Sequence, residues 1–218
     1  RYGENPHQKA ALYSTDGGGI AGAEQLHGKE MSFNNYVDAE AAWNLVQDFD
    51  ERAVAIIKHT NPSGVGTGTT NEEAYKRALA TDPVSAFGGI VAFNTKVDAE
   101  VAKHVIEVFS EVIVAPEYDD DALEIFRSKK NLRILQIGGG NASVNERAGT
   151  LLNSRVSALE YKQISGGFLV QDQDIHRLAV ADLNIVTNRQ PTDTELAAMQ
   201  LAWKVCKHVK SNAIVFAN

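Results

Sequence analysis

Apolar residues in the first 137 positions switch repeatedly between a helical spacing and a strand spacing. Chains that alternate in this way fold as α/β domains, in which helices cover a sheet. Acidic or amide residues that can open helices precede the amphipathic stretches. We therefore expect an α/β domain with helices that begin near Asp38, Asn71, Asp98 and Asp119, and with strands at residues 53–58, 89–93 and 112–115.

Three consecutive glycines at 138–140, and a polar stretch that reaches Asn153, interrupt the alternation. We expect a boundary here, with a first α/β subdomain over residues 1–140 and the start of a second, incomplete one over residues 150–218. In this second part, residues 156–164 and 168–170 flank Gly166 and predict two tightly joined strands. Thr192 and Glu195 predict a capping box that opens a helix, and residues 213–217 predict a last strand before the chain ends at Asn218.

Charge, apolar run length and cysteine content exclude three classes of protein. Twenty-one basic and 28 acidic residues give a formal charge of −7, whereas nucleic-acid binders usually need a basic surface. The longest apolar runs span five residues, far short of the roughly 20 that cross a membrane. Cys206 is the only cysteine and no export leader precedes Arg1, which indicates a reducing compartment. We expect a cytoplasmic protein that binds neither nucleic acid nor membrane.

Three familiar site signatures fail on spacing. Gly22 to Lys29 has one residue too many for a phosphate loop, and Glu30 stands where Ser or Thr is required. The spacing of Gly64, Gly66 and Gly68 is Gly-x-Gly-x-Gly, so the third glycine comes one residue too early for the dinucleotide-binding fingerprint. A zinc deaminase needs His-x-Glu and a Cys pair, and this sequence has neither.

The most informative segment is the end of the expected strand at residues 53–58, where Lys58 and His59 are adjacent before a turn-forming Asn-Pro-Ser-Gly sequence. Strand ends are where α/β proteins place their chemistry. Lys58 offers a cation for developing negative charge, and His59 offers a base that works near neutral pH. The alternative is a strand end with a solvated lysine and an ordinary loop histidine.

Three other segments have a functional interpretation beside a structural one. Residues 1–8 are turn-rich, with Arg1 able to grip a phosphate and Tyr2 able to contact a base, or they are a frayed terminus. Residues 85–89 have glycines that let backbone approach a ligand, or form a plain turn. The basic residues near the end of the last helix are best explained as a solvated cluster that complements the helix dipole: Lys204, Lys207, His208 and Lys210.

Together these segments resemble a known family. The carrying motifs are RYGENPHQ at residues 1–8, KHTNP at 58–62, DPVSAFGG at 82–89 and KSNA at 210–213. In this order they are similar to the AICAR transformylase part of the bifunctional purine biosynthesis enzymes. Ser63 is a departure, since relatives often have Cys there, so a thiol is not essential. Relatives also carry a cyclohydrolase domain before the first motif and further elements after the last.

The resemblance implies transfer of a formyl group from the co-substrate 10-formyltetrahydrofolate to the 5-amino group of AICAR. His59 would be the general base, and Lys58 would stabilise the oxyanion or assist the leaving folate nitrogen. Asn212 would orient His59 or the substrate. Arg1 and Tyr2 would hold the nucleotide, and the cleft for nucleotide and folate would be lined by Phe87, Gly88 and Glu111.

The resemblance also implies a fold, an assembly and the absence of a catalytic metal. Relatives have a cytidine deaminase-like, three-layer α/β/α fold without zinc ligands, and form homodimers whose active sites are shared between subunits. One alternative remains open: the chain could be a fragment that folds, dimerises or binds nucleotide without turnover. A third interpretation, a zinc deaminase, lacks its ligand signature here and would require bound zinc.

Overall fold

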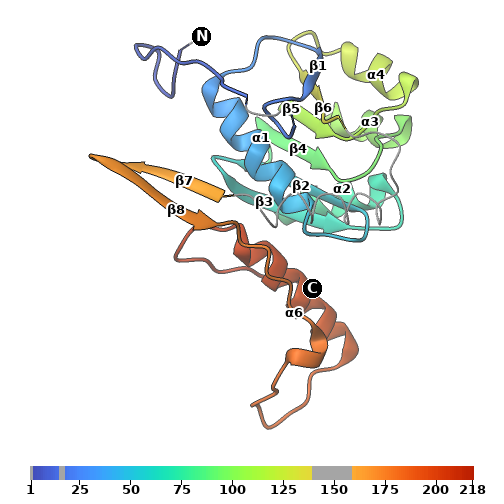
Figure 1. Cartoon of the computed structure of the whole chain (residues 1–218). Coiled ribbons are helices and arrows are strands. Elements are labelled where there is room, and N and C mark those ends of the chain that lie inside the picture. The colour runs from blue at the N-terminus through green and yellow to red at the C-terminus, as the bar shows by residue number, and fades with distance from the viewer. Residues whose placement is uncertain (1, 15–17, 139–158) are drawn as a thin grey trace.

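The computed structural model describes residues 2–14, 18–138 and 159–218, and its centre is a mixed six-stranded sheet (Figure 1). Strand β4 is parallel to β5, and β5 is parallel to β6, while β1, β2 and β3 each run antiparallel to a neighbour. The sheet order is β1-β6-β5-β4-β2-β3. The strands are β1 (Glu24–His27), β2 (Ala53–Lys58), β3 (Asn61–Thr67), β4 (Gly89–Phe93), β5 (Ser110–Ala115) and β6 (Arg133–Gln136).

Helices cover both faces of the sheet, because successive side chains of each central strand point to opposite faces. On β2, Val54 and Ile56 join one buried cluster, while Ala55 and Ile57 join the other. Helix α1 (Phe33–Val46) packs on the second cluster. The first cluster is covered by α2 (Asn71–Thr81), α3 (Ala99–Val105) and α4 (Asp120–Arg127). The expected α/β class is confirmed; a specific relation to cytidine deaminases stays a prediction.

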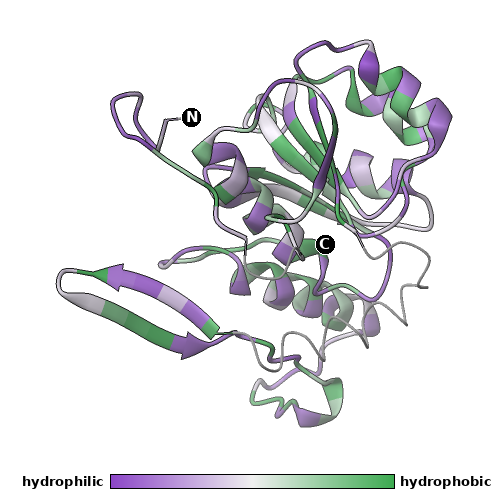
Figure 2. Cartoon of the chain, turned by 45° about the horizontal axis from the view of Figure 1, so that its top comes forward, coloured by the Kyte–Doolittle hydropathy of each residue, from purple (hydrophilic) through white to green (hydrophobic). Residues whose placement is uncertain are grey.

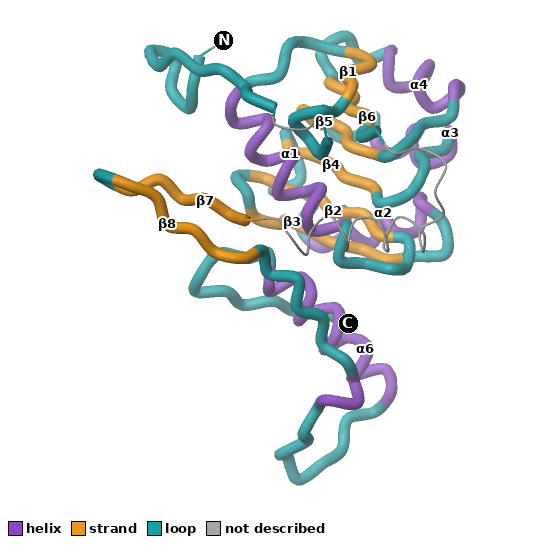
Figure 3. The backbone as a smooth tube through the Cα atoms, viewed as in Figure 1, coloured by secondary structure: helices purple, strands orange, loops and turns teal. Residues whose placement is uncertain are grey.

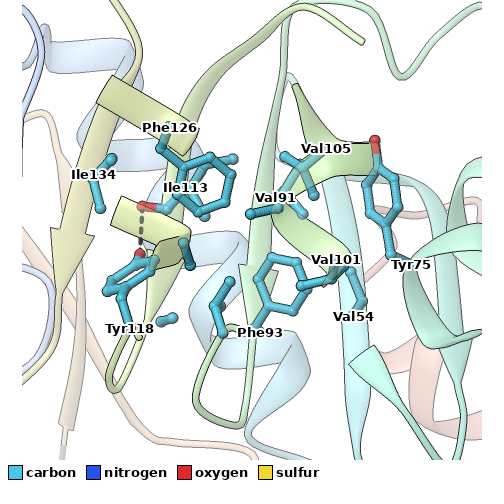
Figure 4. Packing of buried hydrophobic residues seen from close by; sticks show 14 of the residues in the cluster. Val54, Tyr75, Val91, Phe93, Val101, Val105, Ile113, Tyr118, Phe126 and Ile134 are labelled. Carbon is cyan, nitrogen blue, oxygen red and sulfur yellow. Dashed lines mark hydrogen bonds between the residues drawn. The ribbon is translucent and has the colours of Figure 1, made fainter. Parts of the chain in front are cut away.

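The cluster under α2, α3 and α4 is apolar except for the hydroxyls of two tyrosines, Tyr75 and Tyr118. Figure 4 shows the Tyr118 side chain with its hydroxyl hydrogen-bonded to a backbone oxygen, and the Tyr118 ring meets the Phe126 ring edge to face at a centroid distance of 6.2 Å. The Tyr118 hydroxyl donates to the backbone oxygens of Ile113 at 3.2 Å and Leu135 at 2.8 Å. A buried polar group of this kind is tolerated because it is hydrogen-bonded.

Three expected helix starts are confirmed, including that of α4, which begins at Asp120 with Asp119 as its cap residue, and one is wrong. Asp98 caps α3 by accepting a hydrogen bond from the Val101 backbone N–H, and α2 begins at Asn71 with Thr70 as its cap. Helix α1 begins before Asp38, at Phe33, where Ser32 and Asn35 form a capping box. Asn35 thus takes the place of the usual Glu or Gln in the box.

Sequence patterns predict no range for three strands, β1, β3 and β6. Pro62 and two glycines, Gly64 and Gly66, argue against a strand at residues 61–67. Strand β3 nevertheless pairs with β2 along its whole length, and it lies at the edge of the sheet, where proline is tolerated. Its glycines let α2 approach closely: a Cβ built on Gly64 would stand 1.9 Å from the Ala78 backbone oxygen.

The part of the chain after residue 158 forms a hairpin and a helix beside the sheet (Figure 3). The hairpin consists of β7 (Leu159–Ile164) and β8 (Gly167–Asp172), as the sequence predicts. A short 3-10 helix (Val180–Asp182) follows it, and α6 (Asp193–Lys207) begins with the expected Thr192 and Glu195 capping box. The strand expected at residues 213–217 is wrong, because this segment pairs with no strand in the described structure.

The expected boundary between residues 140 and 150 lies outside the described residues, so the subdomain division stays a prediction. No described helix is long and apolar enough to cross a membrane.

Candidate active site

Lys58 is the last residue of β2 and lies at the edge of the sheet formed by strand ends, where the parallel strands β4 and β5 begin. Strand β2 is antiparallel to β4, with Ile57 opposite Ile90, so the carboxyl end of β2 meets the amino ends of β4 and β5. The rule that chemistry follows the carboxyl ends of parallel strands therefore does not describe this edge. The candidate residues Lys58 and Glu111 nevertheless share it, with β4 between their strands.

His59 and Thr60 form the two-residue turn that joins β2 to β3. Their φ angles are 54° and 63°, and Lys58 pairs with Asn61 on either side of them. A hairpin turn with positive φ at both central positions matches the right-handed twist of the strands, but Asn and Gly are its preferred residues. The Thr60 backbone N–H donates to the Asp38 carboxylate at 2.7 Å. Helix α1 thus holds a strained turn in which His59 is exposed to solvent.

The Lys58 ammonium binds the turn that precedes β4. Its Nζ donates to the backbone oxygen of Phe87 at 2.8 Å. Gly88 follows with a φ of 75°, and its N–H donates to the Phe109 backbone oxygen at 2.7 Å. Hydrogen bonds from Ser85 lower the pKa of Asp82 in the same turn, and the charge of Lys58 adds to this effect. The structure therefore brings together three expected site residues: Lys58, Phe87 and Gly88.

The segment that contains Asn212 reaches the same turn from the far end of the chain. The Lys210 backbone N–H donates to the Asn61 side-chain oxygen at 3.3 Å, and the Asn61 amide donates to the His59 backbone oxygen at 3.1 Å. Asn212 is exposed, two residues beyond Lys210. Residues separated by about 150 positions in sequence thus meet at the β2–β3 turn.

Glu111 is engaged by a residue that sequence reasoning missed. The Arg133 guanidinium donates to the Glu111 carboxylate at 2.6 Å and to the Glu30 backbone oxygen at 3.1 Å. The Arg133 side chain is only 7% exposed. Glu111 is therefore a fixed acid at the start of β5, oriented from the neighbouring strand β6.

The N-terminal segment, which carries the expected nucleotide contacts, folds on itself. Arg1 lies outside the described residues, and Tyr2 forms a bridge with Lys9. The Gly3 N–H donates to the Gln8 backbone oxygen at 2.8 Å. Figure 1 shows this segment projecting from the body of the protein. Contact of Arg1 and Tyr2 with a nucleotide stays a prediction.

The basic cluster at the end of α6 is not the solvated group that its sequence indicates. Lys207 and His208 both contact the Asp48 carboxylate, at 3.0 Å and 2.6 Å. Lys204 lies 3.6 Å from the Glu51 carboxylate. No sequence signal links Asp48 to this cluster, because 160 positions separate it from His208.

Over the described residues, no group of three or more His, Cys, Asp or Glu side chains could hold a metal ion.

Comparison with known proteins decides the family. A family model described as AICARFT/IMPCHase bienzyme matches residues 1–218, the whole chain. The chain belongs to this family. Members of the AICARFT/IMPCHase family at about half identity include proteins named bifunctional purine biosynthesis protein PurH. Those of Caulobacter vibrioides, Rhodospirillum rubrum and Persephonella marina are 51%, 52% and 50% identical to the chain, respectively.

These alignments cover 99 to 100% of the chain but only 39 to 40% of each relative, so the chain spans about two fifths of their length. The resemblance inferred from the four motifs is therefore confirmed at the level of the family.

Proposed function

We propose that this chain contributes to transfer of a formyl group from 10-formyltetrahydrofolate to the 5-amino group of AICAR, in purine biosynthesis in the cytoplasm. One observation carries the proposal. Two hydrogen bonds join three distant motif segments at a single sheet edge, from Lys58 to the Phe87 oxygen and from Lys210 to Asn61 beside His59. Family membership supports the reaction class, because the family is described by both of its activities.

In the proposed reaction, the nitrogen of the AICAR amine attacks the formyl carbon and forms a tetrahedral intermediate. His59 takes the proton that the amine loses, and its exposed position leaves it open to substrate. Collapse of the intermediate breaks the bond to the folate N10 atom, which receives a proton. The AICAR amine is a poor nucleophile, since its lone pair is delocalised into the imidazole ring, so removal of its proton is the step that needs help.

Lys58 stabilises the oxyanion of the intermediate, or assists the leaving nitrogen. One of its N–H groups donates to Phe87, and an ammonium has three such groups, so two remain for substrate as far as the described residues are concerned. Asn212 orients His59 or the substrate. Phe87, Gly88 and Glu111 line the cleft, and Arg1 and Tyr2 hold the nucleotide, with their projecting segment presented to the second subunit of a homodimer.

Substitution of the two central residues tests this proposal in the product of the complete reading frame. Lys58→Ala and His59→Ala are each expected to abolish formyl transfer while circular dichroism and the unfolding midpoint stay near those of wild type. Lys76→Ala is the control, since Lys76 lies on the exposed side of α2 and pairs with Glu72. Activity of either central variant within about tenfold of wild type, a barrier change of only ~1.4 kcal/mol, would defeat the assignment.

A second candidate is a unit that binds nucleotide without turnover. The observation that favours it is coverage, since the chain spans about 40% of its relatives. Calorimetry with AICAR and a formyl-transfer assay on residues 1–218 separate the two candidates, because binding without transfer supports the second. Elemental analysis of the same sample tests the remaining deaminase alternative, which requires stoichiometric zinc.

A further inference from the structure

Asp48 is a largely buried carboxylate that lies between two parts of the chain. It follows α1, and its side chain is 8% exposed. His208 Nε2 lies 2.6 Å from the carboxylate and Lys207 Nζ lies 3.0 Å from it, and these two side chains are 16% and 14% exposed. A buried carboxylate is costly unless it is paired, so this arrangement fixes the end of α6 against the end of α1.

Neighbouring contacts align α6 at the same place. Val205 is buried in the cluster between α1 and the sheet. The Lys204 ammonium lies 4.8 Å from the centre of the Phe49 ring and 3.6 Å from the Glu51 carboxylate. Two residues after Asp48, the Asp50 carboxylate pairs with Arg177 at 2.8 Å. Of these groups, only Asp48 contacts the last residue of α6 and the residue that follows it.

A short path leads from this anchor to the candidate active site. His208 is followed by Val209, which packs against the cluster under α1, and by Lys210, whose N–H donates to Asn61. Asn61 in turn contacts the His59 backbone. On the other side, α1 holds the same turn through Asp38 and Thr60. Both halves of the site are therefore attached to α1, one near its start and one just beyond its end.

We propose that Asp48 is a positioning residue, which seats the end of α6 so that Lys210 to Asn212 lie against the β2–β3 turn. The purpose of this placement, to orient Asn212 for formyl transfer, rests on the proposed function. Asp48 touches neither substrate nor reacting atoms in this scheme. It acts through the backbone between His208 and Asn212.

Asp48→Asn tests the proposal, because it keeps the size of the side chain and removes its charge. Asp50→Asn is the matched control: it removes a neighbouring carboxylate that pairs with Arg177 rather than with α6. We measure amide hydrogen exchange at Lys210 in both variants, and kcat and KM in the product of the complete reading frame. Asp48→Asn is expected to raise the Lys210 exchange rate at least tenfold and to lower kcat at least tenfold, with exchange in β2 and β4 unchanged.

Each outcome decides the proposal. Equal Lys210 protection in both variants overturns it, and so does a kcat within twofold of wild type in an Asp48→Asn protein whose segment has loosened. If wild type transfers no formyl group, the proposed function fails, and the exchange rates alone then support or overturn the anchoring. If Asp48→Asn does not fold, His208→Gln, which leaves Lys207 paired with Asp48, is expected to change both quantities in the same direction by about threefold.

Discussion

Thr60 combines a β-branched side chain with a φ of 63°, a conformation that such residues rarely adopt. Its N–H bond to Asp38 and its place in a two-residue hairpin turn hold it there. A non-glycine residue in this region costs of order 1–3 kcal/mol, and such strain gathers at functional sites. We interpret the turn as the feature that presents His59 to solvent at the sheet edge.

Thr60→Gly is expected to stabilise the protein by about 1 kcal/mol, because glycine adopts a positive φ without a steric penalty. The Asp38 contact uses only the backbone N–H and is retained. Urea unfolding of the variant and of wild type measures the difference. A loss of more than about 1 kcal/mol would show that the Thr60 hydroxyl, which donates to the His59 oxygen, matters more than the strain.

The pairing of Asp48 also predicts how the stability of the protein depends on pH. Burial by itself would raise the pKa of Asp48, but hydrogen bonds and charges from His208 and Lys207 lower it below the usual value. Because the folded pKa is the lower one, the carboxylate stabilises the fold above its unfolded pKa of about 4, and this contribution is lost as pH falls through the folded pKa.

The test compares wild type with Asp48→Asn by urea unfolding between pH 7 and pH 3. Wild type is expected to be more stable by about 2 kcal/mol at pH 7, since a buried ion pair is broken, and the difference is expected to shrink towards pH 3. The nearby carboxylates of Glu51 and Asp50 pair with Lys204 and Arg177, respectively. Both carboxylates are present in wild type and in Asp48→Asn, so they do not contribute to the difference. A difference that is constant with pH would show that the Asp48 charge does not matter.

At the scale of elements, the contact between β3 and α2 depends on small residues. The Cβ of an alanine at Gly64 would stand 1.9 Å from the Ala78 backbone oxygen, and α2 could only accommodate it by moving. Gly64→Ala is therefore expected to cost about 3 kcal/mol of stability. Gly167→Ala is the matched control, since a Cβ there meets nothing within 4 Å. Thermal or urea unfolding of both variants checks the prediction, and equal stabilities would contradict it.

Elements also show where sequence patterns were sufficient. Strands β2 and β4 match the expected ranges, and the caps at Asp98 and Thr192 form as predicted. Apolar runs and caps act over a few residues, so a short window reveals them. Strand β3 was missed because its glycines and Pro62 suit an edge position beside a close helix, and only the sheet order shows that position.

At the scale of the whole molecule, apolar burial is uneven. The residues of β4 are all buried, whereas every residue of β7 is exposed. Figure 2 shows apolar residues along β8 in this hairpin, where Phe168 is 65% exposed. A two-stranded hairpin with both faces open is only marginally stable in water.

Amide hydrogen exchange rates measured on residues 1–218 should therefore differ between the central sheet and the β7–β8 hairpin. We expect amides of β4 to exchange only through global unfolding, and amides of β7 and β8 to exchange at least 100-fold faster at low protein concentration, because little packing protects them. Protection of the hairpin that rises with protein concentration would support the homodimer proposed above. Protection equal to that of β4 at every concentration would contradict the expectation.

The sequence by itself determined the α/β class, most helix and strand positions, and the motifs that place the chain in its family. Each of these depends on the order of neighbouring residues. Only the tertiary structure decided that β2 runs against β4, that Asp38 holds the His59 turn, and that Asp48 is paired with His208. These contacts join residues 22 to 160 positions apart, and strand direction and ion pairing at such separations follow from packing rather than from any local pattern.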